Sequence, residues 1–221
     1  MLKDYFQLRT LSLIIIGDFN PAIIQPFWLA KKGLIKEQEA NSAKVEIVHP
    51  QLTRYDLDWV FLEISENRFV FNSSKEPFFD IVRDLVSGIF TFLPETPISA
   101  IGINHLLHYT LPREEQYLEL GNRLTPLRNW ENVLDDPKLL ELNITEQKRR
   151  DKHKGHYAVK IQPSELVPKY GVLFSINDHL ALEEGETGRE TELIKRLNLI
   201  WNESKERPER VVEQLWTNLN I

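Results

Sequence analysis

The feature that most constrains the fold is an apolar run over residues 11–16, which contains three consecutive isoleucines and ends at Gly17. Continuous runs of this length, rich in β-branched residues and closed by a turn residue, are typical of strands that are covered on both faces. We therefore expect residues 11–16 to form a central strand of a sheet, with packing partners on each side.

Two amphipathic patterns accompany this strand in the first half of the chain. Asn20 can cap a helix that has Pro21 in its first turn and ends at Gly33. Apolar residues at three- and four-residue spacing predict a second helix over residues 78–92, and residues 98–110 read as the strand that follows it.

Extended segments lie between the two expected helices. Residues 44–58 are expected to be extended, with a break in the middle, and the β-rich runs 59–64 and 68–72 flank a short polar turn. Two such runs around a short turn indicate a hairpin. The resulting order is strand, helix, hairpin, helix, strand, which is the split βαβ arrangement of ferredoxin-like domains.

The second half of the chain is less regular. Residues 113–124 have a helical pattern, residues 139–147 and 156–161 are extended around a basic stretch at 148–154, and residues 170–182 predict the last strand. The chain should end in two helices, with Pro208 in the first turn of the final one, where proline is tolerated.

These elements predict an α+β protein with a mixed, mostly antiparallel sheet and helices packed on one side. The length allows a single domain over 1–221. It also allows two halves, a ferredoxin-like half over 1–112 and a half over 113–221 made of a strand hairpin and the C-terminal helices.

Composition excludes several classes of function. The chain has no cysteine, so it has no disulfide, thiolate nucleophile or cysteine-containing metal site. Its net charge of −6 argues against general nucleic-acid binding, which needs a dominant basic face. The chain shows neither a signal-peptide pattern at its start nor an apolar run long enough to span a bilayer. We expect a cytoplasmic protein that does not bind membranes.

Polar clusters follow the apolar alternation of two strands. On the strand expected at 98–110, Asn104 and His108 lie on one face and His105 lies on the other. On the strand expected at 170–182, Asn177 and His179 share a face. If the two strands are neighbours, these side chains converge, and imidazole serves both as a general base and as a ligand. The alternative is that these polar groups only satisfy one another within the sheet.

A third polar segment follows the strand at 11–16, where Asp18 and Asn20 precede the first helix. Ligands often bind at this end of a strand, and the alternative is that both residues are only helix caps. No nucleotide-binding or hydrolase motif occurs, so we assign no catalytic residue, metal or cofactor. The candidate ligand-binding residues are Asp18, Asn20, Asn104, His108, Asn177 and His179.

A basic patch occupies the expected hairpin tip at 148–154. Such a tip can dock on phosphates or on an acidic protein surface, or it can be a solvated charged turn. No aromatic residue is interleaved, so the stacking platform of single-strand binding is missing. The patch consists of Lys148, Arg149, Arg150, Lys152 and Lys154.

Three short segments carry a resemblance to known proteins: GDFNPA at 17–22, IGIN at 101–104, and INDH at 176–179 with a following helix that bears Trp201. Together they resemble a sporadically distributed family of bacterial proteins of unassigned function. The resemblance implies a bacterial, cytoplasmic, full-length unit and carries no catalytic residues. Sporadic distribution fits accessory systems, including defence against phage.

The sequence thus leaves three hypotheses for function. The first is a non-enzymatic protein-interaction subunit or adaptor that docks protein partners through the ends of its sheet or its C-terminal helices. The second is a metal- or small-ligand-binding sensor or enzyme that uses Asp18, Asn104, His108, Asn177 and His179. The third and weakest is nucleic-acid binding through the basic hairpin 148–154. The absence of a chemical motif favours the first and leaves enzymatic activity undecided.

Overall fold

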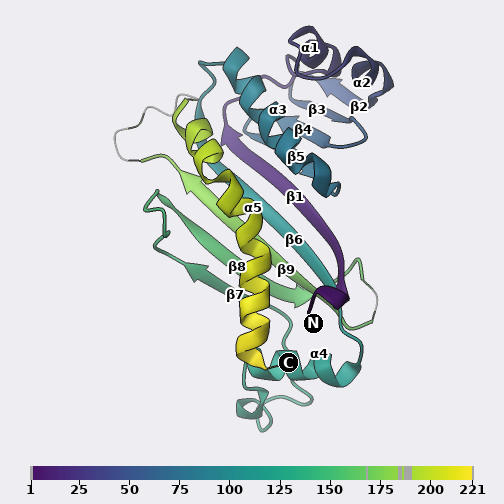
Figure 1. Cartoon of the computed structure of the whole chain (residues 1–221), viewed down its shortest axis with the longest axis vertical. Coiled ribbons are helices and arrows are strands. Elements are labelled where there is room, and N and C mark those ends of the chain that lie inside the picture. Colours follow the sequence, from purple (N-terminus) through teal and green to yellow (C-terminus); the bar gives the residue numbers. More distant parts are fainter. Residues whose placement is uncertain (1, 168, 184–185, 187–190, 221) are drawn as a thin grey trace.

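A computed structural model of the chain, which describes residues 2–167, 169–183, 186 and 191–220, shows an α+β protein built on one open sheet (Figure 1). The sheet has nine strands in the order β2-β3-β4-β5-β1-β6-β9-β8-β7. The strands are β1 (Phe6–Gly17), β2 (Lys44–His49), β3 (Leu52–Asp56), β4 (Phe61–Ser65), β5 (Arg68–Ser73), β6 (Ile98–Thr110), β7 (Leu142–Glu146), β8 (Gly155–Pro163) and β9 (Gly171–Ala181).

Five α-helices and three short 3-10 turns complete the described structure. The helices are α1 (Pro26–Lys31), α2 (Glu37–Ser42), α3 (Phe79–Phe92), α4 (Glu114–Leu124) and α5 (Thr191–Leu219). The 3-10 turns are η1 (Leu2–Tyr5), η2 (Glu76–Phe78) and η3 (Leu127–Asn129). No helix in the described part of the chain is both long enough and apolar enough to cross a membrane.

Every pair of neighbouring strands is antiparallel, so the prediction of a mixed sheet is wrong. The reason is that a crossover connection joins two strands that are not neighbours in the sheet. Strands that run in the same direction, such as β5 and β6, are separated by a strand that runs the opposite way, here β1. The hairpin of β4 and β5 and the long strand β6 are confirmed, and residues 44–58 form a further hairpin, β2 and β3.

The first helix starts later than the sequence predicts. The side chain of Asn20 accepts a hydrogen bond from the backbone N–H of Ala22 at 3.2 Å, which closes a turn at residues 21–23. Helix α1 begins only at Pro26, whose missing N–H is harmless in a first turn. Asn20 therefore caps a turn rather than a helix.

The end of the chain is one helix, α5, and the prediction of two helices is wrong. Pro208 lies inside this helix, where it removes the hydrogen bond to the carbonyl of Ser204. The carbonyl of the next residue, Lys205, accepts a hydrogen bond from the buried guanidinium of Arg9 on β1. A side chain of the sheet thus compensates for a helix backbone group near the proline, and α5 continues past it.

All five helices pack on the same face of the sheet, which we call the covered face. Helices α1, α2 and α3 and the first half of α5 share an apolar cluster with Ile101 and Ile103 of β6. Helix α4 and the second half of α5 share another cluster with Leu107 and Tyr109 of the same strand. Because these four residues alternate along β6, both clusters lie on one face. Figure 1 shows α5 running across β6, β9 and β8.

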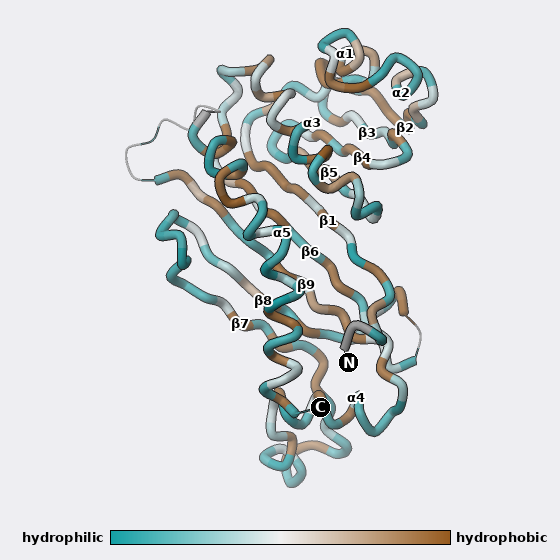
Figure 2. The backbone as a smooth tube through the Cα atoms, viewed as in Figure 1, coloured by the Kyte–Doolittle hydropathy of each residue, from teal (hydrophilic) through white to brown (hydrophobic). Residues whose placement is uncertain are grey.

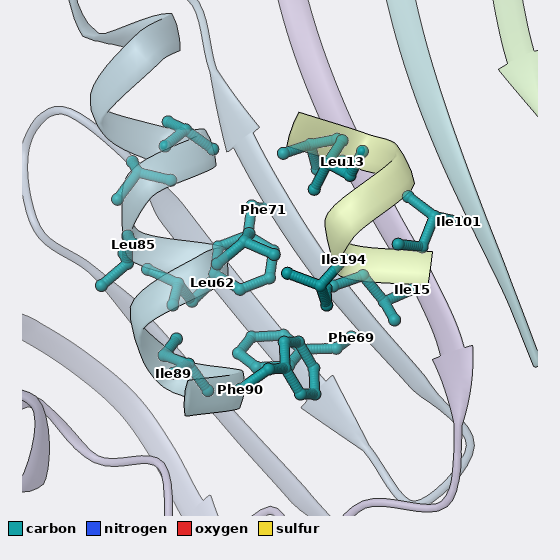
Figure 3. Packing of buried hydrophobic residues seen from close by; sticks show 14 of the residues in the cluster. Leu13, Ile15, Leu62, Phe69, Phe71, Leu85, Ile89, Phe90, Ile101 and Ile194 are labelled. Atoms are coloured by element: carbon teal, nitrogen blue, oxygen red, sulfur yellow. The ribbon is translucent and has the colours of Figure 1, made fainter. Parts of the chain in front are cut away.

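Aromatic residues fill the centre of the covered face. Phe69 and Phe71 stack on β5 with ring centroids 4.2 Å apart, and Phe90 of α3 packs against Phe69. Figure 3 shows these rings between α3 and the first turn of α5, with Ile194 approaching β1. Burial of such side chains, worth about 1.5–3 kcal/mol each, fixes the helices on this face.

The opposite face of the central strands, which we call the open face, has no described helix on it. On β1, Leu11, Leu13 and Ile15 are fully buried, whereas Ile14 is only partly buried and Ile16 is 39% exposed. Figure 2 shows the hydrophobic stretch of β1 that contains both sets. The expectation that this strand is covered on both faces is therefore wrong for the described chain, and apolar residues on its second face are left without a packing layer.

Candidate functional site

A row of neutral polar residues crosses the open face at the middle of the sheet. Ser12 of β1 lies opposite Asn104 of β6, and Asn104 lies opposite Asn177 of β9. The Asn177 amide donates a hydrogen bond to the Asn104 side-chain oxygen, and Asn104 Nδ2 donates to the Ser12 carbonyl at 3.1 Å. The two asparagines selected from sequence therefore lie together on neighbouring strands, which meets the condition under which they were expected to converge.

The row extends one strand beyond the residues found by sequence. Asn72 of β5 lies opposite Ser12, so four adjacent strands carry Asn, Ser, Asn and Asn at one level. Asn72 and Ser12 were missed because their positions become informative only once the strand register is known. We call Asn72, Ser12, Asn104 and Asn177 the amide row.

Two histidines lie beside the amide row. His179 of β9 faces His156 of β8, and their rings stack with centroids 4.7 Å apart. Burial lowers the pKa of His179, and the nearby His156 and Arg149 lower it further. Because a charged ring would be repelled here, His179 is a neutral hydrogen-bonding group at neutral pH.

The other sequence candidates lie elsewhere. His108 is four residues along β6 from Asn104, about 13 Å away, and hydrogen-bonds to Ser164 at 2.8 Å. Asp18 and Asn20 follow the end of β1, so Asp18 is about 20 Å from the amide row. Both border a shallow hollow beside the turn after α3. The structure thus brings together Asn104, Asn177 and His179, and it keeps the rest apart.

The basic hairpin is a loop between β7 and β8, but Arg149 is not part of an exposed patch. Its side chain is only 5% exposed and forms ion pairs with Asp151 and with Asp178 of β9. It also donates to the His179 carbonyl at 3.1 Å. Arg149 therefore fastens the loop to the sheet, while the four remaining basic residues of the patch, Lys148, Arg150, Lys152 and Lys154, are exposed.

A second polar cluster, which sequence reasoning missed, lies on the covered face. Arg9 of β1 donates hydrogen bonds to His105 Nδ1 from Nε at 3.3 Å and Nη2 at 3.1 Å. It also donates to Glu209 of α5 at 2.7 Å and to the Lys205 carbonyl. The available signal was the alternation of Arg9 with Leu11 and Leu13, which places a charged residue on the buried face.

The environment of His105 keeps its ring neutral. The side chain is fully buried, and burial together with the charge of Arg9 lowers its pKa to about 3. Its Nε2 makes no hydrogen bond of normal geometry. The backbone of Ser204 raises the pKa of the ring and so offsets part of this decrease. His105 accepts hydrogen bonds from Arg9, which link β6 to β1, and its ring is inaccessible to solvent.

The two clusters therefore differ in what they can do chemically. The amide row offers neutral donors and acceptors on a partly exposed surface, while the cluster of Arg9 and His105 is buried. In the described part of the chain, no three side chains of the metal-binding types come together as a metal site. Neither protein-family models nor curated proteins match this chain.

Proposed function

We propose that the protein is a non-enzymatic interaction subunit that assembles through the open face of its sheet, and that the occupant of this face is a second copy of the chain. The observation that carries the proposal is the lack of charge on the three central strands of that face. On these strands the residues directed to this face are Leu8, Thr10, Ser12, Ile14 and Ile16 (β1), Ala100, Gly102, Asn104, Leu106 and His108 (β6), and Leu173, Ser175, Asn177, His179 and Ala181 (β9). Gly102, His108 and Leu173 among them are buried, and the others are partly or fully exposed.

Charged residues begin only at the flanks of this face. On one side Arg54 of β3 pairs with Glu63 of β4 at 2.6 Å, and on the other Lys160 of β8 pairs with Glu141 at 3.3 Å. Charged residues make up 27% of the chain, so a neutral centre between charged margins is a strong local bias. A centre depleted of charge with a polar rim is the usual anatomy of a protein interface.

The size of the face is that of a small interface. The four spacings between β5, β1, β6, β9 and β8 add up to about 19 Å, and Leu8 and Ile16 are about 26 Å apart. The footprint is therefore about 500 Å², which places the proposed dimer below the roughly 800 Å² per partner of a standard interface.

The chemistry of the face supports a copy of itself as the occupant. Amide side chains both donate and accept hydrogen bonds, so the amide row can pair with the same row of another copy. A symmetric dimer brings identical surfaces together, and a neutral face avoids the like-charge contacts that this would otherwise create. Apolar Ile14, Ile16 and Leu106 lie beside the row and would be buried as well.

We propose also that the first half of the sheet is a ferredoxin-like unit. The order β4-β5-β1-β6, with helical crossovers between β1 and β4 and between β5 and β6, supports it. In this view the hairpin of β2 and β3 is an insertion in the first crossover, and β9, β8 and β7 extend the sheet. The role of such a subunit in a bacterial accessory or antiviral system rests on the resemblance of short segments and stays a prediction.

The two alternative functions have less support. A single ligand site needs Asp18, His108 and the amide row to converge, and the strand register separates them by about 13–20 Å. Nucleic-acid binding through the basic hairpin would have to proceed without Arg149, because its side chain forms ion pairs with Asp151 and Asp178.

Light scattering coupled to size exclusion, over a concentration series, tests the proposal. We expect a mass of about twice the chain's 26.0 kDa. Leu106→Glu places a charge at the centre of the open face and should give a monomer, as should Thr10→Glu beside it on β1. Leu199→Glu on α5, where the side chain is 78% exposed, is the matched control and should leave the dimer intact.

Circular dichroism would establish that each variant is folded. A wild-type chain that remains monomeric at every concentration would overturn the proposal. So would a dimer that persists in folded Leu106→Glu and Thr10→Glu variants.

A further inference from the structure

An apolar groove lies at the far end of the covered face, away from the open face. It is formed by α4, the segment that leads from η3 to β7, and the ends of β8 and β9, and it encloses a cavity of about 310 Å³. Leucines dominate the lining, among them Leu118, Leu124, Leu139 and Leu140. Tyr117 and Lys138 also line it, so polar groups are few.

Apolar side chains at the groove and in the adjoining segment remain in contact with solvent. Leu118 is 39% and Leu140 78% exposed, although both line the cavity. Trp130, Val133 and Leu134, which lie between η3 and β7, are each about half exposed or more. Contiguous apolar residues that a chain leaves in water mark a surface for another molecule.

The surroundings of the groove are acidic. Residues 113–141, which contain α4 and the connecting segment, hold seven acidic and four basic residues. Two acid–base pairs lie within this segment, Arg123 with Glu119 at 2.6 Å and Lys138 with Asp136 at 2.9 Å, and Glu141 pairs with Lys160 of β8. Outside these pairs the segment has four acidic and two basic residues, so its balance stays acidic. Glu114 and Glu115 begin α4 and are exposed. A partner that brings positive charge to the rim is therefore favoured.

We propose that this groove binds a basic amphipathic helix of a partner protein, with the apolar face of the helix in the cavity and its lysine or arginine side chains over the acidic rim. Helices of this kind dock in apolar grooves through anchors spaced three and four residues apart. The cavity is at the lower limit of the volume that a drug-sized ligand needs, whereas separate side-chain anchors suit it. The inference adds a second surface to the proposed subunit and would make it an adaptor.

Fluorescence anisotropy with a labelled synthetic peptide tests this. The probe is a helix-forming peptide of about 18 residues, or five turns, with leucine on one face and lysine on the other. A peptide of the same pattern with glutamate in place of lysine is its control. We expect the leucine–lysine peptide to bind at least about tenfold more tightly, a difference of about 1.4 kcal/mol.

Three leucine-to-glutamate variants locate the binding. Leu140→Glu should weaken binding of the leucine–lysine peptide about tenfold or more. Leu199→Glu is its control, because both leucines are 78% exposed and only Leu140 lines the groove. Leu106→Glu on the open face should bind the peptide normally, so failure of the dimer and failure of the groove can be told apart.

Several results would overturn the proposal. These are equal affinity of the leucine–lysine peptide for the wild type and Leu140→Glu, equal affinity of the two peptides, or no binding of either. A dimer that dissociates on Leu140→Glu would assign the groove to a second copy instead, and would count against a heterologous helix.

Discussion

Two polar clusters lie one residue apart on β6 and face opposite sides of the sheet. On the covered face, His105 and Arg9 are buried under α5 and connect it to the sheet. On the open face, Asn104 bonds to Asn177 and to the Ser12 carbonyl, and all three residues remain partly exposed. The first cluster contains a charged group and lacks solvent, whereas the second is neutral and retains solvent.

This difference assigns the clusters to different tasks. A buried charged network is costly to disrupt, because each group that loses its partner keeps its desolvation penalty. A neutral pair at a partly exposed surface can exchange its partner for water or for another protein at little cost. We therefore expect the covered cluster to stabilise the fold and, under the proposed function, the open cluster to take part in recognition.

The largest expected effect is at Arg9. Arg9→Met removes the donor to His105 and to the Lys205 carbonyl, and the His105 ring that loses its donor stays buried. We expect the free energy of unfolding to fall by about 2–4 kcal/mol in urea denaturation followed by circular dichroism. Ser12→Ala, three residues along the same strand but on the open face, should change it by less than about 0.5 kcal/mol. Similar losses for the two variants would contradict the division of tasks.

A smaller effect is expected from pH. The pKa of His105 is about 3 in the fold, below about 6.5 for an unfolded histidine, so the unfolded chain takes up the proton first. The stabilisation is complete above about pH 6.5 and is lost as the pH falls toward 3. Between pH 7 and pH 5 the loss should be on the order of 1–2 kcal/mol.

The variant His105→Gln isolates this contribution, since glutamine accepts from Arg9 and does not titrate. His108 and His179 also have lowered pKa values and act in the same direction, so only the difference between the two proteins reports His105. Urea denaturation at several pH values should give a shallower pH dependence for the variant. Parallel curves would show that His105 does not resist protonation.

The same contrast explains what the sequence could and could not predict. Alternation alone places His105 and His108 on opposite faces, and the asparagines that it selects, Asn104 and Asn177, do pair across β6 and β9. The faces are a consequence of local periodicity, whereas the pairing joins residues 73 positions apart and is only a condition of the prediction. The hairpin of β4 and β5 was likewise predictable from local periodicity.

What failed depended on contacts distant in sequence. Pro208 predicts a helix start, but α5 continues through it, and a nearby carbonyl, that of Lys205, is satisfied by Arg9, 196 residues away. The isoleucines of β1 predict two covered faces, yet the helices that the structure describes all pack on one of them. The basic run at 148–154 predicts a patch, but Arg149 turns inward to Asp178.

Of the two cluster disruptions, the one at the amide row should cost less unfolding free energy. It is the most direct test of the difference between the two clusters. Asn177→Ala removes the amide that donates to Asn104, and the freed oxygen is partly exposed and can bond to water. We expect a loss of unfolding free energy of about 0.5–1 kcal/mol at most, well below that of Arg9→Met. If recognition is the task of the row, the same variant should weaken the dimer more than it weakens the fold, in sedimentation equilibrium against urea denaturation. A loss of fold stability with unchanged association would instead make the row a structural element of the sheet, equivalent in kind to the cluster beneath α5.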